Sequence, residues 1–227
     1  MNTNTELDYA ALGRRAINQA LQQADAGAFT VANPNGAHAL ACGLMAPLEV
    51  RVKGSTGYYC AGMNQQAHVH VEGSAGPGVA ENMMSGHVVI EGDASQYAGA
   101  TAHGGMLVIK GNASSRCGIS MKGVEIVVRG NIGHMSAFMA QSGSLVVCGD
   151  AGEALGDSIY EAKLFVRGKV ASLGADCEEK EMDAENLAHL SDLLTRAGIQ
   201  DMDPSEFRRY GSARRLYHFD IDNAGAY

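Results

Sequence analysis

Three histidines, His68, His70 and His87, come closest in type and spacing to a chemical site. Imidazole nitrogens bind zinc and related metals, and His68 and His87 are 19 residues apart, which is a spacing that recurs along the chain. A metal centre needs further ligands, and the pattern brings no carboxylate or thiolate to complete one. His103 and His134 also lack an acid or nucleophile partner. The sequence therefore predicts no catalytic residue, and the three histidines stand only as candidate metal ligands.

Cofactor-binding signatures are also missing from the chain. The cysteines at positions 42, 60, 117, 148 and 177 form no C-x-x-C pair and match no zinc or iron–sulfur spacing. Residues 73–78 read G-x-x-G-x-G, but this stretch lies in a corner of a repeat and does not open a helix, so it is not a dinucleotide-binding loop. We expect reduced, mostly packed thiols and no cofactor held by this chain itself.

These side chains belong to a repeat of 19 residues, and the fold of this repeat must position them. Apolar residues stand four and two positions before each repeated glycine, and this alternation predicts a strand. A small polar residue usually follows the glycine and favours a turn through local hydrogen bonds. Seven positions after the glycine only Ala or Gly occurs, which predicts a second crowded corner. The repeated glycines are Gly54, Gly73, Gly92, Gly111, Gly130, Gly149 and Gly168.

The repeat decides the fold class. Every strand has the same phase and the same following glycine, which favours parallel stacking over an antiparallel meander. Leucine-rich repeats need a different apolar frame, and propeller blades need about 40 residues. The sequence therefore predicts an all-β fold, a right-handed single-stranded parallel β-helix of about seven 19-residue coils, with the hand taken from the general rule for parallel crossovers.

Helical caps are expected at both ends, because the open ends of a solenoid must be covered. A capping helix is predicted in residues 1–27, the β-helix in residues 28–176, and a helix with an extended docking tail in residues 177–227. In the last segment Asp183 is the predicted N-cap, and a second short helix is expected over residues 204–209. The apolar face of the main helix would consist of Leu187, Leu190, Leu194 and Ala197.

Two surfaces are predicted to be interfaces. Three positions before the glycine, the outward residues of five successive coils are apolar, and such a stripe needs a cover, either a terminal helix of this chain or a partner subunit. In the tail, four arginines alternate with tyrosines, and we interpret them as contacts to an acidic partner surface in preference to RNA. The stripe is Val89, Val108, Val127, Val146 and Phe165, and the arginines are Arg208, Arg209, Arg214 and Arg215.

Composition excludes several function classes. The net charge of -8 opposes binding to nucleic acid or to an anionic membrane. The first eight residues lack the basic flank and apolar core of a signal peptide, and no apolar run is long enough to span a membrane. We therefore expect a cytoplasmic protein.

The glycine ladder, the V-x-V-x-G runs between His87 and Gly130, and the stretch 129–133 resemble the carboxy-terminal Gly-X-Gly-X-Gly domain of the glutamate synthase large subunit. The resemblance covers roughly residues 28–176. Because the domain stands alone, and because of the tail sequence 207–213, the chain looks most like the separate β-helix subunit of N-methylglutamate synthase, a methylamine-glutamate N-methyltransferase.

This resemblance implies a structural subunit inside an enzyme complex. The implied partners are a class-II, glutaminase-type amidotransferase chain and a glutamate-synthase-like chain that carries FMN and iron–sulfur. The sequence departs from those catalytic chains, since it begins Met1-Asn2 and offers no nucleophilic amino-terminal cysteine. Two alternatives remain: a β-helix subunit of a formylmethanofuran dehydrogenase or formyltransferase/hydrolase complex, and a self-contained solenoid enzyme or ligand-binding protein.

Overall fold

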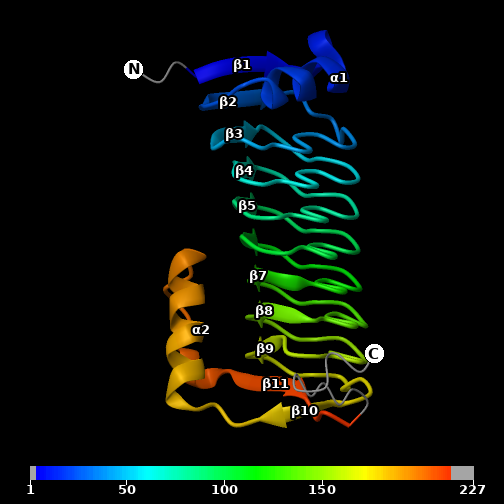
Figure 1. Ribbon diagram of the computed structural model, residues 1–227, viewed down its shortest axis with the longest axis vertical. Coiled ribbons are helices and arrows are strands. Elements are labelled where there is room, and N and C mark those ends of the chain that lie inside the picture. The colour runs from blue at the N-terminus through cyan, green and yellow to red at the C-terminus, as the bar shows by residue number, and fades with distance from the viewer. Residues whose placement is uncertain (1–3, 216–227) are drawn as a thin grey trace, which may run out of the picture.

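The computed structural model describes residues 4–215 and contains one 11-stranded sheet that runs the length of a solenoid (Figure 1). Strands β1 to β9 are parallel and follow one another in chain order. This confirms the predicted parallel β-helix. The strands are β1 (Asn4–Asp8), β2 (Gly27–Ala32), β3 (Leu48–Val52), β4 (His68–Val71), β5 (His87–Ile90), β6 (Met106–Ile109), β7 (Lys122–Val128), β8 (Ser142–Val147), β9 (Lys163–Val166), β10 (Cys177–Lys180) and β11 (Arg208–Ser212).

The apolar alternation sets the register of the sheet. From β3 to β9 each apolar residue lies beside its equivalent 19 positions later, as Val50 lies beside Val69 and Val69 beside Val88. These side chains point into the coil, where Val69 is 1% exposed and Val88 is fully buried. The stacked interior forms one continuous apolar core along the solenoid, and its burial is the main source of stability.

The corner glycines are required because neighbouring coils approach closely there. A Cβ atom at Gly130 would lie 2.5 Å from Asn112 Oδ1. That oxygen accepts a hydrogen bond from the backbone N–H of Asn131 at 2.9 Å, and Asn131 does the same for Asp150 at 2.7 Å. The polar residues after the glycines therefore bond to the next coil, whereas the sequence predicted local turn bonds.

A second side of each coil is held by single parallel bridges between equivalent residues, such as Ala75 with Ala94. The third side contains backbone with positive φ at alternate residues, for example Tyr59, Ala61 and Met63 with φ of 61°, 53° and 55°. Only small residues fit at the middle position, which is fully buried at Ala61. This is the second crowded corner that the Ala or Gly pattern predicted.

The amino-terminal end is closed by helix α1 (Tyr9–Gln22), which is capped by the side chain of Asp8 and broken at Gly13. Ile17 and Leu21 are buried against the first coil. The helix is preceded by β1, which pairs in parallel with β2 and extends the sheet by one strand. The sequence predicted the capping helix but gave no indication of this strand.

Helix α2 (Ala184–Arg196) begins after Asp183, the predicted N-cap, whose side chain accepts from the backbone of Asn186. It lies along the outer face of the lower strands in Figure 1. After it, the chain forms a 3-10 turn (Pro204–Glu206) and then β11, which inserts antiparallel between β9 and β10. The short helix expected over residues 204–209 is thus present only as a 3-10 turn over residues 204–206, because the chain becomes extended from Arg208 to complete the sheet. The predicted tail beyond Arg215 lies outside the described residues.

Neither α1 nor α2 is long and apolar enough to cross a membrane, and these are the α-helices within residues 4–215.

Candidate functional site

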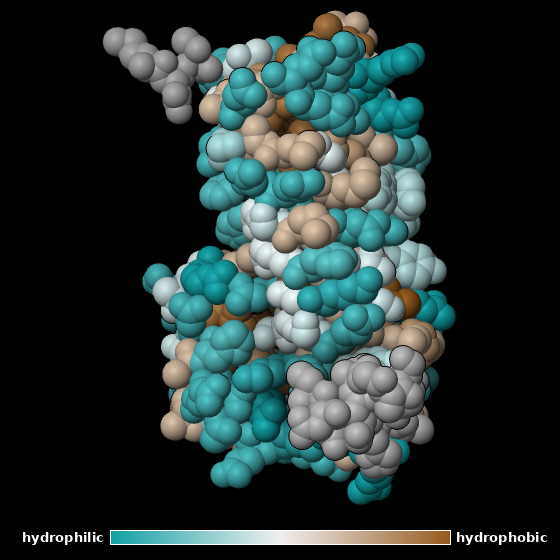
Figure 2. Space-filling model, in the orientation of Figure 1, coloured by the Kyte–Doolittle hydropathy of each residue, from teal (hydrophilic) through white to brown (hydrophobic). Residues whose placement is uncertain are grey.

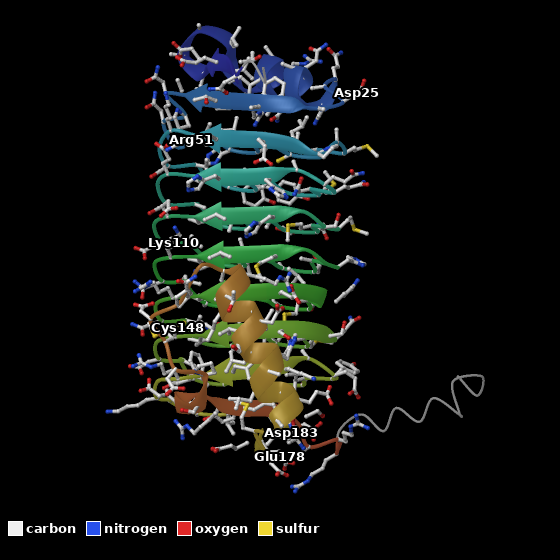
Figure 3. All side chains as sticks on the ribbon, turned by 90° about the vertical axis from the view of Figure 1, so that its left-hand side faces the viewer. Asp25, Arg51, Lys110, Cys148, Glu178 and Asp183 are labelled. Carbon is white, nitrogen blue, oxygen red and sulfur yellow. The ribbon has the colours of Figure 1, made fainter. Side chains whose placement is uncertain are left out.

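A groove of about 590 Å³ lies on the outer face of strands β2 to β5, next to the end of α2. Figure 3 shows two of its lining residues, Arg51 and Lys110, on the sheet above the upper end of the helix. The strands position these side chains by their alternation, since every second residue points out of the coil. The titratable groups that line the groove are Glu49, Arg51, His68, His70, His87, Glu91, Lys110 and Arg196.

Most charges in the groove pair with one another across coils. His70 Nε2 lies 2.7 Å and Lys110 Nζ lies 2.9 Å from Glu91 Oε1, and Arg51 pairs with Glu72. The hydrogen bond from Lys110 is the main reason that the pKa of Glu91 is lowered. These pairs are partly exposed, so each contributes about 0–1 kcal/mol to stability. They tie successive coils together on the outside.

His68 and His87 come together as their spacing predicted. Their rings meet edge to face with centroids 5.8 Å apart, and His68 Nδ1 lies 3.2 Å from Glu49 Oε1. His87 Nε2 is buried and has no hydrogen-bond partner among the described residues. Burial lowers the pKa of His87, and the charges of His68 and Arg196 lower it further while Glu49 opposes them.

The candidate metal ligands do not assemble into a site. Within residues 4–215 no group of three or more His, Cys, Asp or Glu side chains is placed to hold a metal ion. His70 turns to Glu91 and away from the His68–His87 pair, so the three histidines belong to two separate contacts. In this arrangement they provide polar, titratable contact groups on an open face.

The predicted apolar stripe is covered by the chain's own α2. Val108, Val127, Val146 and Phe165 are at most 1% exposed, and they pack with Leu190, Leu193, Leu194 and Phe207. Val89 lies just beyond the helix and is half-buried. Two ion pairs flank the contact, Arg196 with Glu125 at 2.5 Å and Arg129 with Asp201 at 2.6 Å. The sequence allowed either a terminal helix of this chain or a partner subunit to cover the stripe. In the structure the cover is the chain's own helix.

The four tail arginines make contacts within the chain. Arg208 donates to Gly168 O at 3.1 Å, and Arg209 donates to Glu181 O at 2.8 Å. Arg214 pairs with Glu161 at 2.8 Å, and the backbone N–H of Arg215 donates to Asp176 at 2.8 Å. These bonds fasten β11 and the residues after it to the last coils.

All five cysteines are free thiols. Burial is the main cause that raises the pKa of Cys42 and Cys148 to about 11, and that of Cys60, Cys117 and Cys177 to about 12. A thiol with so high a pKa is almost entirely protonated near neutral pH and is a poor nucleophile or metal ligand.

The sequence predicts Met63 and Met84 to be packing residues or adaptable interface contacts, and the structure exposes both, together with Met45, at one corner of the upper coils. Met45, Met63 and Met84, here called the methionine corner, are 64%, 48% and 47% exposed. At the coil positions of Met63 and Met84 most repeats have another residue type, and Met45 precedes the repeat. The periodicity of the sequence therefore gave no signal for the cluster. It becomes visible only when the coils are stacked.

Comparison with curated proteins finds Protein GlxC of Rhizobium meliloti (strain 1021), which is 66% identical to this chain over 225 residues. The match covers 97% of this chain and 99% of that protein, so it includes the solenoid, the groove and both helices. No family model matches the chain. No matching solved structure was found.

Proposed function

This chain belongs to the same family as Protein GlxC, and from that premise we propose that it is a non-catalytic structural subunit of a glutamate-synthase-like enzyme complex. The proposal is carried by the regularity of the solenoid. From β3 to β9 the register advances by 19 residues per coil with one local irregularity, between Lys122 and Glu125. Such a rod keeps two partners at a fixed separation and orientation.

The packing of the coils supports a rigid spacer. Backbone hydrogen bonds join successive coils on all three sides, and a continuous apolar core fills the interior. Helix α2 then fixes four coils together along the outside through Leu190, Leu193 and Leu194. A protein packed in this way resists bending, because bending would open inter-coil bonds and expose apolar surface.

The complex that best fits the sequence resemblance is N-methylglutamate synthase. In that assignment the rod aligns a glutaminase-type amidotransferase chain with a synthase chain that binds FMN and iron–sulfur, in the cytoplasm. The partner chains would carry out the chemistry. His70, Glu91 and Lys110 of the groove pair with one another, which supports a structural role for these side chains.

A native purification tests the proposal. The full-length chain is tagged in its own cells and recovered under mild conditions, the co-purifying chains are identified by mass spectrometry, and the absorption spectrum of the complex is recorded. We expect an amidotransferase chain and a yellow flavin chain, and glutamate formation that depends on methylamine or ammonia. Recovery of a pterin-type formyl-transfer complex, or of the chain alone, would contradict the proposal.

A further inference from the structure

The three side chains of the methionine corner lie in adjacent coils and are open to dissolved reagents. Met84 N donates to Asn64 O at 2.8 Å, and Asn64 follows Met63 directly. Gln65 N donates to Leu44 O at 2.8 Å, and Leu44 precedes the first methionine of the corner. Figure 2 shows apolar surface over the upper coils on the face toward the viewer. Three thioethers are therefore gathered and accessible at one place on the rod.

The other methionines of residues 4–215 are less accessible. Met83 is the direct neighbour of Met84 in the sequence, yet it is fully buried in the core. Met106 and Met121 are at most 4% exposed. Only Met139, at 37%, comes near the exposure of the corner. The methionines of intermediate burial are Met135, Met182 and Met202.

The cysteine thiols do not compete with the corner for an oxidant. Peroxide oxidises the thiolate form, and burial raises the pKa of all five thiols to about 11 or 12. Near pH 7 a thiol with a pKa of about 11 is ionised in only about one molecule in ten thousand. Four of the thiols are also buried, and Cys177 is half-buried. A thioether needs no deprotonation, so access to its sulfur governs its oxidation.

We propose that the methionine corner is a site of reversible oxidation, at which hydrogen peroxide converts Met45, Met63 and Met84 to sulfoxides before the other sulfur atoms of residues 4–215 react. The thioether sulfur attacks one peroxide oxygen and loses two electrons to it. The O–O bond breaks, the sulfur keeps that oxygen, and the other oxygen leaves as water. A methionine sulfoxide reductase reverses the step: two thiols form a disulfide, and the sulfoxide oxygen leaves as water. The inference is independent of the complex in which the chain works.

Oxidation at this corner changes the surface and leaves the fold in place. A sulfoxide is polar where the thioether is apolar. The residues at the positions equivalent to Met63 in the next three coils are polar, so the same part of the coil accepts a polar side chain. They are Asn82, Thr101 and Ser120. The buried Met83 stays reduced, and the core that holds the coils together is unchanged.

Peptide mapping of the unmodified full-length chain tests the order of oxidation. The purified protein is exposed to dilute hydrogen peroxide near pH 7, samples are quenched with catalase at intervals, and added oxygen is located by tandem mass spectrometry. We expect Met84 to be oxidised at least about tenfold faster than Met83, with Met45 and Met63 close to Met84. After unfolding, all five cysteines should still react with iodoacetamide. If Met83 is oxidised as fast as Met84, or if thiols are lost before the corner is oxidised, the proposal is overturned.

Variants test what the oxidation does to the surface. One variant combines Met45→Leu, Met63→Leu and Met84→Leu, since leucine is similar in volume and has no sulfur. The matched control is Met139→Leu, which lies at the same coil position as Met63 four repeats later. Retention on a hydrophobic-interaction column and circular dichroism are measured before and after peroxide treatment.

Peroxide should shorten the retention of the unmodified chain and of Met139→Leu, and treatment with both methionine sulfoxide reductases and a thiol should restore it. The triple variant should show at most a small change, and the circular dichroism of every folded protein should stay the same. An equal change in the triple variant, a retention that the reductases do not restore, or loss of the β-helix spectrum on oxidation would each contradict the proposal. The peptide mapping needs no variant, so it decides the order of oxidation even if the triple variant does not fold.

Discussion

At Gly130 the stacking of two coils leaves no room for a side chain. An added Cβ would lie 2.5 Å from Asn112 Oδ1 and 2.7 Å from Gly111 O. Inter-coil hydrogen bonds hold both backbones in place, and overpacking of this kind costs about 1–3 kcal/mol. We therefore expect Gly130→Ala to lower the free energy of unfolding by about that amount in chemical denaturation.

Gly198 provides the control for this substitution. A Cβ there would meet no atom within 4 Å, and only its φ of 73° disfavours alanine, at about 1 kcal/mol. Gly130 itself does not have a positive φ, so its substitution tests the close approach of the coils. If Gly130→Ala were no more destabilising than Gly198→Ala, close approach would not be the reason for glycine at this corner.

His87 should make stability depend on pH. Its pKa is lowered in the folded protein, chiefly by burial and then by His68 and Arg196, with Glu49 acting in the opposite direction. The unfolded chain therefore binds more protons as the pH falls through the ordinary value of 6.5, and stability declines until the folded pKa is passed. We expect His87→Gln to weaken the fall in melting temperature between about pH 7.5 and 5.5. His103→Gln, at an exposed position, should leave that fall unchanged; the same weakening in both variants would contradict the role of His87.

At the scale of elements, α2 should contribute much of the stability of the lower coils. Leu193 is fully buried between the helix and the sheet, and truncation of such a leucine costs about 2–5 kcal/mol. We expect Leu193→Ala to reduce the free energy of unfolding within this range, measured by denaturant titration. Ser191→Ala changes an exposed position of the same helix and should stay within about 0.5 kcal/mol of the original protein. A Leu193→Ala variant as stable as Ser191→Ala would show that the helix is not firmly docked.

The strands were predictable because their side chains obey a local period, while the elements that close the solenoid obey none. Val50 and Val69 reveal their pairing through identical spacing and patterning. Strand β11 pairs with β9 through Tyr210 and Leu164, which lie far apart in the sequence and share no repeat. Strand β1 is short and mostly polar, so neither alternation nor composition marks it as part of the sheet.

The outer face of the solenoid was likewise predictable only in part. The sequence located the stripe from Val89 to Phe165 but left its cover open, because coverage depends on where α2 turns back along the coils. Leu193 is a fully buried member of that contact that the helical pattern did not single out. The methionine corner was not recognised because Met45 lies before the 19-residue repeat, and only hydrogen bonds between coils, such as Gln65 N to Leu44 O and Met84 N to Asn64 O, place its segment beside those of Met63 and Met84.

At the scale of the whole molecule, the coil of 19 residues should behave as a removable unit. Deletion of residues 93–111 removes one whole coil and joins Gly92 to Asn112. Strand β5 would then pair with β7 in the register that β6 now provides. Val89 would take the place of Val108 under α2. We expect this chain to fold, with lower stability and a rod shorter by about 4.8 Å, and to show the far-ultraviolet circular dichroism of a β-helix with a cooperative thermal transition. Deletion of residues 93–110 removes one residue fewer and shifts the following strands against the corner ladder, which turns apolar side chains outward. We expect that variant to fail to fold. If both deletion variants folded equally well, the register between coils would not determine this structure.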